Sequence, residues 1–213
     1  MAPIETFEHE GLTVEIDYDS DPQNPREDTQ VASLVCWHKR YVLGDEQPKV
    51  GAPEWGLEKA REFVPDLLDL DTPEDQEAVN RILNDKLEIV GLYLYDHSGI
   101  TMSTAPFSCP WDSGQVGFAY VTLNALAECD MLDPKPTAWT PELRARAREI
   151  IKQEVEEYDA FLRGEVYGYV VKKTKTCDLG HRHDEVIDSC CGFIGELDYC
   201  KSEAKAAASA HKD

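Results

Sequence analysis

The chain has 213 residues, and its 42 acidic and 21 basic side chains give a formal net charge of −21 at pH 7. Nucleic acids and anionic membranes are bound through Lys and Arg side chains, so this charge argues against both as direct partners. A hydrophobic content of 42%, without a long apolar segment or an export signal, predicts a globular cytoplasmic protein whose seven cysteines are reduced thiols.

Polar–apolar alternation and short apolar runs predict seven strands, which cover residues 12–18, 31–37, 87–95, 100–104, 115–122, 166–171 and 185–194. The segment Asp96-His97-Ser98-Gly99 is typical of a tight turn, because Asp and Ser cap turns and Gly adopts positive φ. We expect it to join the third and fourth strands as a hairpin. The Trp37-His38-Lys39-Arg40-Tyr41 segment is an aromatic and basic cluster, in which we expect a cation to stack on a ring within the fold.

Helix start signals occur twice, as Thr-Pro-Glu at residues 72–74 and again at residues 140–142. We expect two helices between residues 53 and 85, and the first signal marks the start of the second of them. The second signal marks the start of a long helix that ends at Gly164. Arg144, Arg146, Arg148 and Lys152 are expected on the solvent face of the long helix, paired with Glu149 and Glu156.

Hairpin-joined strands with helices inserted between them favour an α+β fold. We expect a single domain over residues 1–200, with an antiparallel sheet covered by helices. Residues 201–213 contain no large apolar side chain and are expected to form a flexible tail.

Acidic residues are concentrated in two stretches, one near the N-terminus and one in residues 65–80. Such stretches serve solubility, or they dock on a basic groove that otherwise holds nucleic acid. The acidic binding surface predicted on the second interpretation comprises Asp17, Asp19, Asp21, Asp66, Asp69, Asp71, Glu74, Asp75 and Glu77.

Two further groups of side chains are candidates for a metal-binding site and for a catalytic site. Cys177, His181, His183 and Cys190 offer the sulfur and imidazole ligands of a structural zinc site, although their spacing also suits a metal-free hairpin. A hydrolase would need a nucleophile beside His and Asp, and the candidates for such a set are His38, His97, Cys109, Asp112 and Ser113. These residues equally suit turns, and no Gly-x-Ser-x-Gly motif is present.

Several blocks of the sequence resemble a family of uncharacterised proteins encoded by phages and other mobile elements. The blocks are Ser33–Glu46, Gly91–Met102, Trp111–Val121, Glu154–Tyr169 and Asp188–Gly195. The chain departs from the resemblance at Cys191, where an aromatic residue is expected. The resemblance implies an accessory gene, and inhibitors of host nucleases and defence systems are common among such genes.

Together, these observations favour a non-enzymatic acidic accessory protein that binds and inhibits a host or phage protein, without a cofactor or with structural zinc. A small hydrolase and a zinc-stabilised adaptor are the alternatives.

Overall fold

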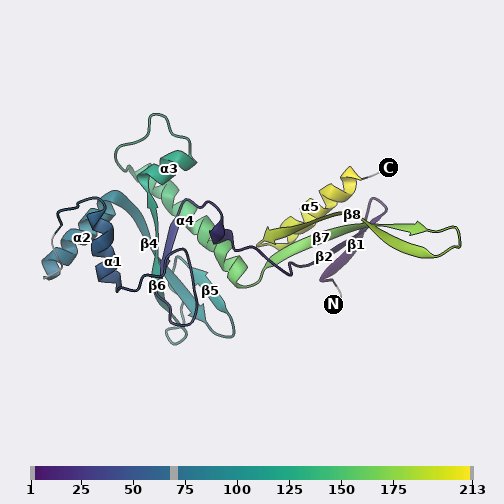
Figure 1. The fold of residues 1–213 in the computed structure, drawn as a ribbon, viewed down its shortest axis with the longest axis horizontal. Helices are drawn as coiled ribbons and strands as arrows, with labels where there is room; N and C mark the ends of the chain where they lie inside the picture. The colour runs from purple at the N-terminus through teal and green to yellow at the C-terminus, as the bar shows by residue number, and fades with distance from the viewer. Residues whose placement is uncertain (1–2, 68–71, 212–213) are drawn as a thin grey trace. The chain divides into compact units, whose positions relative to one another are not determined.

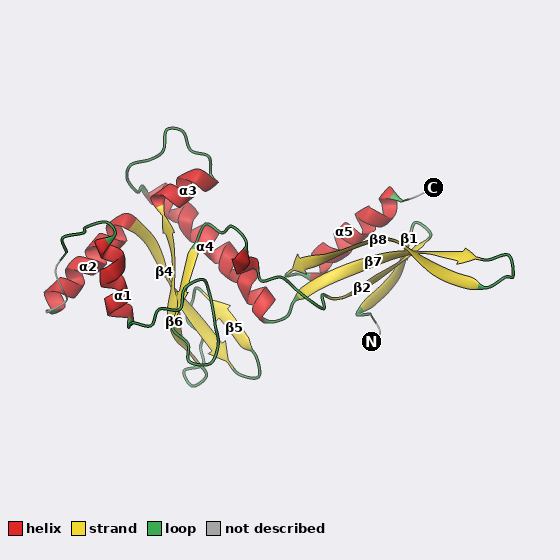
Figure 2. Cartoon of the chain, viewed as in Figure 1, coloured by secondary structure: helices red, strands yellow, loops and turns green. Residues whose placement is uncertain are grey.

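The computed structural model describes residues 3–67 and 72–211. Within these residues it contains five α-helices and eight strands in two antiparallel sheets, which confirms the predicted α+β class (Figures 1 and 2). The chain divides into two compact units: unit 1 is formed by residues 1–27 and 157–213, and unit 2 by residues 28–156. Where the sequence predicts one antiparallel sheet, each unit has its own, because local patterns specify strands but not their partners.

Unit 1 is a four-stranded sheet in the order β1-β2-β7-β8, with helix α5 packed against one face (Figure 1). Its elements are β1 (Glu5–His9), β2 (Leu12–Tyr18), a 3-10 turn (Pro25–Glu27), β7 (Val166–Thr176), β8 (Arg182–Ile194) and α5 (Leu197–Ala210). Leu12, Val14 and Ile16 of β2 are buried in the core beneath α5. Since side chains alternate along a strand, Thr13, Glu15 and Asp17 lie on the other face, which we call the open face.

Helix α5 corrects the prediction of a flexible tail after residue 200. Cys200, Ala204 and Ala208 lie four residues apart along one side of α5, and all three are fully buried. Small side chains let the helix approach the sheet closely, and Tyr167 and Tyr169 supply the bulk of this core from β7. The absence of large apolar residues from α5 therefore reflects close packing of the helix on the sheet, and not a flexible tail.

Unit 2 is a second four-stranded sheet, in the order β3-β6-β4-β5. Its strands are β3 (Ser33–Cys36), β4 (Leu87–Asp96), β5 (Ile100–Ser103) and β6 (Ser113–Thr122), and its helices are α1 (Ala52–Arg61), α2 (Pro73–Lys86), α3 (Leu123–Cys129) and most of α4 (Pro141–Leu162). Helices α1 and α2 share a core with Val35, Leu87 and Tyr120 of the sheet.

The predicted start of α2 is confirmed in detail. The Thr72 hydroxyl accepts a hydrogen bond from the backbone of Asp75, and the Asp75 carboxylate accepts one from the backbone of Thr72, which together form a capping box.

In the described part of the chain, no helix is both long and apolar enough to cross a lipid bilayer.

Candidate functional site

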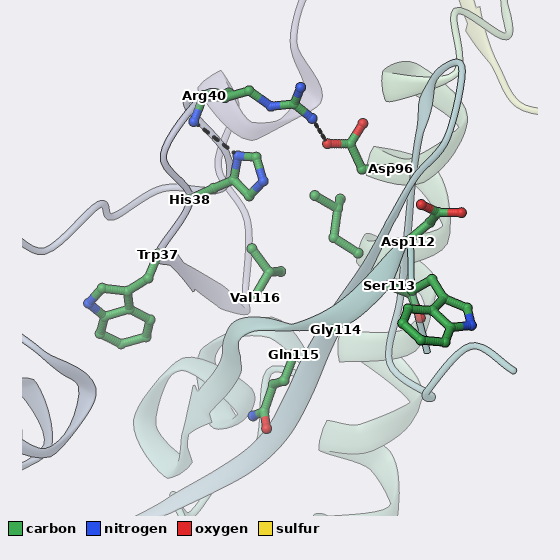
Figure 3. Close-up of a pocket in the computed structure, with 11 residues that line it drawn as sticks. Trp37, His38, Arg40, Asp96, Asp112, Ser113, Gly114, Gln115 and Val116 are labelled. Atoms are coloured by element: carbon green, nitrogen blue, oxygen red, sulfur yellow. Dashed lines mark hydrogen bonds and ion pairs between the residues drawn. The ribbon is translucent and has the colours of Figure 1, made fainter. Parts of the chain in front are cut away.

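A cavity of about 430 Å³ opens at one end of the unit 2 sheet, and we call it the unit 2 pocket (Figure 3). Its lining comes from the loop after β3, the end of β4, and the start of β6 with the two residues before it. Leu94 and Val116 are buried, whereas His38, Arg40 and Asp96 provide polar lining. The pocket thus combines apolar and polar side chains from three segments that are far apart in sequence.

Arg40 and Asp96 form an ion pair at this pocket (Figure 3). The Tyr41 hydroxyl lies 3.4 Å from the other carboxylate oxygen of Asp96. The Arg40 guanidinium also lies over the Tyr41 ring, 5.2 Å from its centroid, which confirms the predicted cation stacking in this cluster. Asp96 therefore fixes the loop after β3 to the end of β4.

His38 is oriented by the same loop. Its Nδ1 accepts hydrogen bonds from the backbone N–H groups of Arg40 (3.3 Å) and Tyr41 (3.1 Å). The His38 ring is stacked on Tyr41 with a centroid distance of 4.9 Å. Because Nδ1 accepts, the neutral ring carries its hydrogen on Nε2, which makes His38 a hydrogen-bond donor on its outer side.

The structure brings three of the hydrolase candidates together around one carboxylate. Asp112 Oδ2 lies 3.3 Å from Nδ1 of His97 and 3.8 Å from the Cys109 sulfur. The backbone N–H of Asp96 donates to the backbone oxygen of Asp112 at 2.8 Å, which joins this loop to β4. Ser113 lies next to the group, and its hydroxyl donates to the backbone oxygen of Cys109.

This arrangement differs from that of a catalytic triad. In a triad the imidazole stands between nucleophile and carboxylate and accepts the proton of the nucleophile. Here the carboxylate of Asp112 stands between Cys109 and His97, and the Ser113 hydroxyl closes a turn. The geometry therefore suits a rigid loop better than nucleophilic catalysis.

Trp111 is not among the site residues that the sequence predicts; it lines the unit 2 pocket, and 91% of its surface is exposed. Trp37 also lines the pocket, but its ring packs at a steep angle against Trp55 and Phe118, and its indole N–H donates to Val50. The only sequence signal for Trp111 is a large aromatic residue in a turn-rich loop between Pro110 and Asp112.

The predicted zinc ligands are not assembled. Cys177 and His181 bond through their backbones at the tip of the β7–β8 hairpin, and His183 is opposite Lys175 in the ladder. Cys190 is opposite Tyr169, seven residues farther along β8, or about 23 Å at 3.3 Å per residue. The four side chains therefore cannot meet at one ion, and the described residues contain no group of three or more His, Cys, Asp or Glu arranged to hold a metal.

The predicted acidic residues divide between the two units. Asp17, Asp19 and Asp21 belong to unit 1, whereas Asp66, Glu74, Asp75 and Glu77 belong to unit 2. Asp69 and Asp71 lie outside the described residues. Both units are acidic: unit 1 has 19 acidic and nine basic residues, and unit 2 has 23 and 12, for net charges of −10 and −11.

A second hollow of about 430 Å³ lies on unit 1, where β2, β7 and β8 adjoin. Glu15, Asp17 and Asp19 line it, together with Gly168 and Cys191. A Cβ at residue 168 would lie 3.1 Å from the Cβ of Cys191, so a side chain there would crowd β8. Three carboxylates thus surround a hollow whose middle strand has no side chain at Gly168.

Asp19 is held in this hollow by the backbone. Its carboxylate accepts hydrogen bonds from the N–H groups of Asp21 (3.0 Å) and Gly192 (3.1 Å). The Asp19 charge, with some burial, raises the pKa of the neighbouring Cys191 thiol. Cys191 is therefore held as the neutral thiol beside a carboxylate that is fixed in place.

Comparison with known proteins gives no relative from which to transfer a function. No family model, no curated protein and no solved structure matches the chain.

Proposed function

We propose that the chain binds a basic host protein, of the kind whose usual ligand is nucleic acid, through the open face of unit 1. The observation that carries this proposal is the alternation of β2, which turns Glu15 and Asp17 away from the α5 core and toward a hollow that Asp19 also lines. The chain is then a non-enzymatic acidic inhibitor that acts in the host cytoplasm, in keeping with its resemblance to phage and mobile-element proteins.

The charge balance on the open face supports a cationic partner. Glu8 of β1 is exposed and accepts a hydrogen bond from Thr13, which places its carboxylate on the same face as Asp17. Lys172 pairs with Glu15 at 2.6 Å and offsets one of these charges. An excess of carboxylates remains, and such a field accelerates encounter with a Lys- or Arg-rich surface and repels nucleic acid itself.

The hollow also gives the open face a shape that can accept a cationic side chain of the partner. Its volume of about 430 Å³ is enough to admit a lysine or arginine side chain of the partner. Because Asp19 is fixed by two backbone N–H groups, it can receive a cation without first being ordered.

The experiment is capture from host lysate on the immobilised full chain, followed by zero-length coupling of carboxylates to amines and identification of the linked residues. The test variant carries Glu8→Lys and Asp17→Lys, and a charge-matched control carries Asp66→Lys and Glu77→Lys in unit 2. All four side chains are exposed.

We expect the test variant to lose capture at least tenfold, the control variant to retain it, and the links to map to Glu8, Glu15 or Asp17. Capture should weaken as salt is raised, because the contact is ionic. Equal loss in both variants would show that net charge alone is responsible, and a salt-independent partner would contradict the proposal.

A further inference from the structure

The unit 2 pocket points to a second ligand of a different class. We propose that it binds a neutral saccharide, with one sugar ring stacked on the indole of Trp111. This inference is independent of partner binding at the open face of unit 1.

The exposure of Trp111 is the first observation. An indole that is 91% exposed presents a broad apolar face to water at the edge of a cavity, and Trp is one of the residue types enriched where binding energy is concentrated. The apolar C–H face of a pyranose ring matches a flat aromatic surface, and its hydroxyl groups project sideways, where they can reach polar neighbours.

The second observation is that the charged lining side chains already have partners. Arg40 is paired with Asp96, and Asp112 is contacted by His97 and Cys109. An ionic ligand would have to displace one of these contacts. An anion would also meet a unit with a net charge of −11, and a cation would meet the Arg40 guanidinium, which is 66% exposed. A neutral ligand meets neither penalty.

The third observation is the mixture of donors and acceptors. The guanidinium of Arg40 and Nε2 of neutral His38 are donors, the carboxylates of Asp96 and Asp112 are acceptors, and the Gln115 amide is both. A sugar hydroxyl donates and accepts at once, so it can use every group in such a lining. The cavity of about 430 Å³ falls within the usual range for small-molecule sites.

The test is a screen of the full chain on an array of neutral mono- to tetrasaccharides, with sialylated and phosphorylated glycans on the same array. The best neutral glycan is then titrated by calorimetry, with adenine as a flat neutral probe that contains no sugar. Trp111→Ala removes the proposed stacking surface, and Trp111→Phe keeps a ring. Met131→Ala is the matched control, because Met131 is 87% exposed in unit 2 but does not line the pocket.

We expect a neutral glycan to bind with an affinity that does not change with salt. Trp111→Ala should weaken it at least tenfold, Trp111→Phe should retain most of it, and Met131→Ala should leave it unchanged. Absence of binding to every neutral glycan, unchanged affinity in Trp111→Ala, or tighter binding of adenine or an anionic glycan would overturn the proposal. Circular dichroism of each variant checks that the fold is intact.

Discussion

Arg144 of α4 donates a hydrogen bond of 2.7 Å to the carboxylate of Glu88, which lies buried on β4 with 4% of its surface exposed. Arg148, one turn farther along α4, donates to the other oxygen of the same carboxylate at 2.5 Å. Arg144 also donates to the backbone oxygens of Asn84, near the end of α2, and of Leu87, the first residue of β4. One carboxylate therefore fastens α4 to the junction of α2 and β4.

Replacement of Glu88 by Gln should destabilise the protein by about 3 kcal/mol, because it leaves two arginines without their buried counter-charge. Arg146→Gln is the control, since Arg146 pairs with Asp130 and Glu149 at more exposed positions and its loss should cost much less. Urea unfolding measures both. Equal losses of unfolding free energy in the two variants would mean that the buried Glu88 pairs stabilise the protein no more than the exposed Arg146 pairs do.

Replacement of Gly117 by Ala should disrupt the pairing of β3 with β6. A Cβ at residue 117 would lie 1.9 Å from the backbone oxygen of Val35, and neither strand can move away without breaking the ladder. We expect a loss of about 2 kcal/mol or more. Gly114→Ala, in the same strand, meets no atom within 4 Å and should cost much less. Thermal unfolding of the two variants distinguishes them.

Replacement of Ala204 by Leu should loosen α5 from the unit 1 sheet. Ala204 is fully buried, so three additional carbons overpack the interface and should cost about 1–3 kcal/mol. Ala206 is exposed on the same helix, and Ala206→Leu should be close to neutral. Hydrogen exchange of α5 backbone amides should quicken in the first variant only; unchanged protection there would show that α5 tolerates bulk.

Cys200 should make stability fall at alkaline pH. Burial raises the pKa of its thiol to about 11 from an ordinary value of 9.0. A raised folded-state pKa contributes stability that is fully present below pH 9 and is lost as the pH rises toward about 11.

The measurement is the free energy of unfolding against pH, with Cys200→Ala as the comparison. The decline between pH 9 and about 11 should be shallower in the variant. Parallel curves would assign the decline to other groups. At pH 8 the exposed Cys190 should react with a thiol reagent in the folded protein, whereas the buried Cys200 should react only after unfolding.

The sequence predicted elements well where the signal is local. The Thr72 cap and the turn at residues 96–99 depend on neighbouring residues, and the structure has both. The prediction failed for β1 and α5 together, for one physical reason. Glu5 of β1 pairs with Lys201 of α5, and Lys201 also lies over the Phe7 ring. Neither segment is apolar enough to predict a buried face by itself. Each could be predicted only from its contacts with the other.

The candidate sites show the same limit. Turn chemistry at Asp96 and Asp112 correctly placed polar residues at strand ends, but it could not show that Asp112 would stand between Cys109 and His97. Arg144 and Arg148 were expected on the solvent face of α4, because helix periodicity cannot anticipate a buried Glu88 on a strand. The expected pairs of Arg146 with Glu149 and of Lys152 with Glu156 do form, since both lie within one turn of helix.

The two-segment composition of unit 1 has a consequence for biosynthesis. Ile16 of β2 pairs with Tyr169 of β7, and all of unit 2 lies between them in sequence. As the chain leaves the ribosome, the β1–β2 hairpin emerges before unit 2, and two strands alone are marginally stable in water. Unit 2 is contiguous and can fold in the interval, whereas the hairpin must wait for residues 166–194. The open face thus forms after unit 2, and a chain interrupted between α4 and β7 would display unit 2 without it.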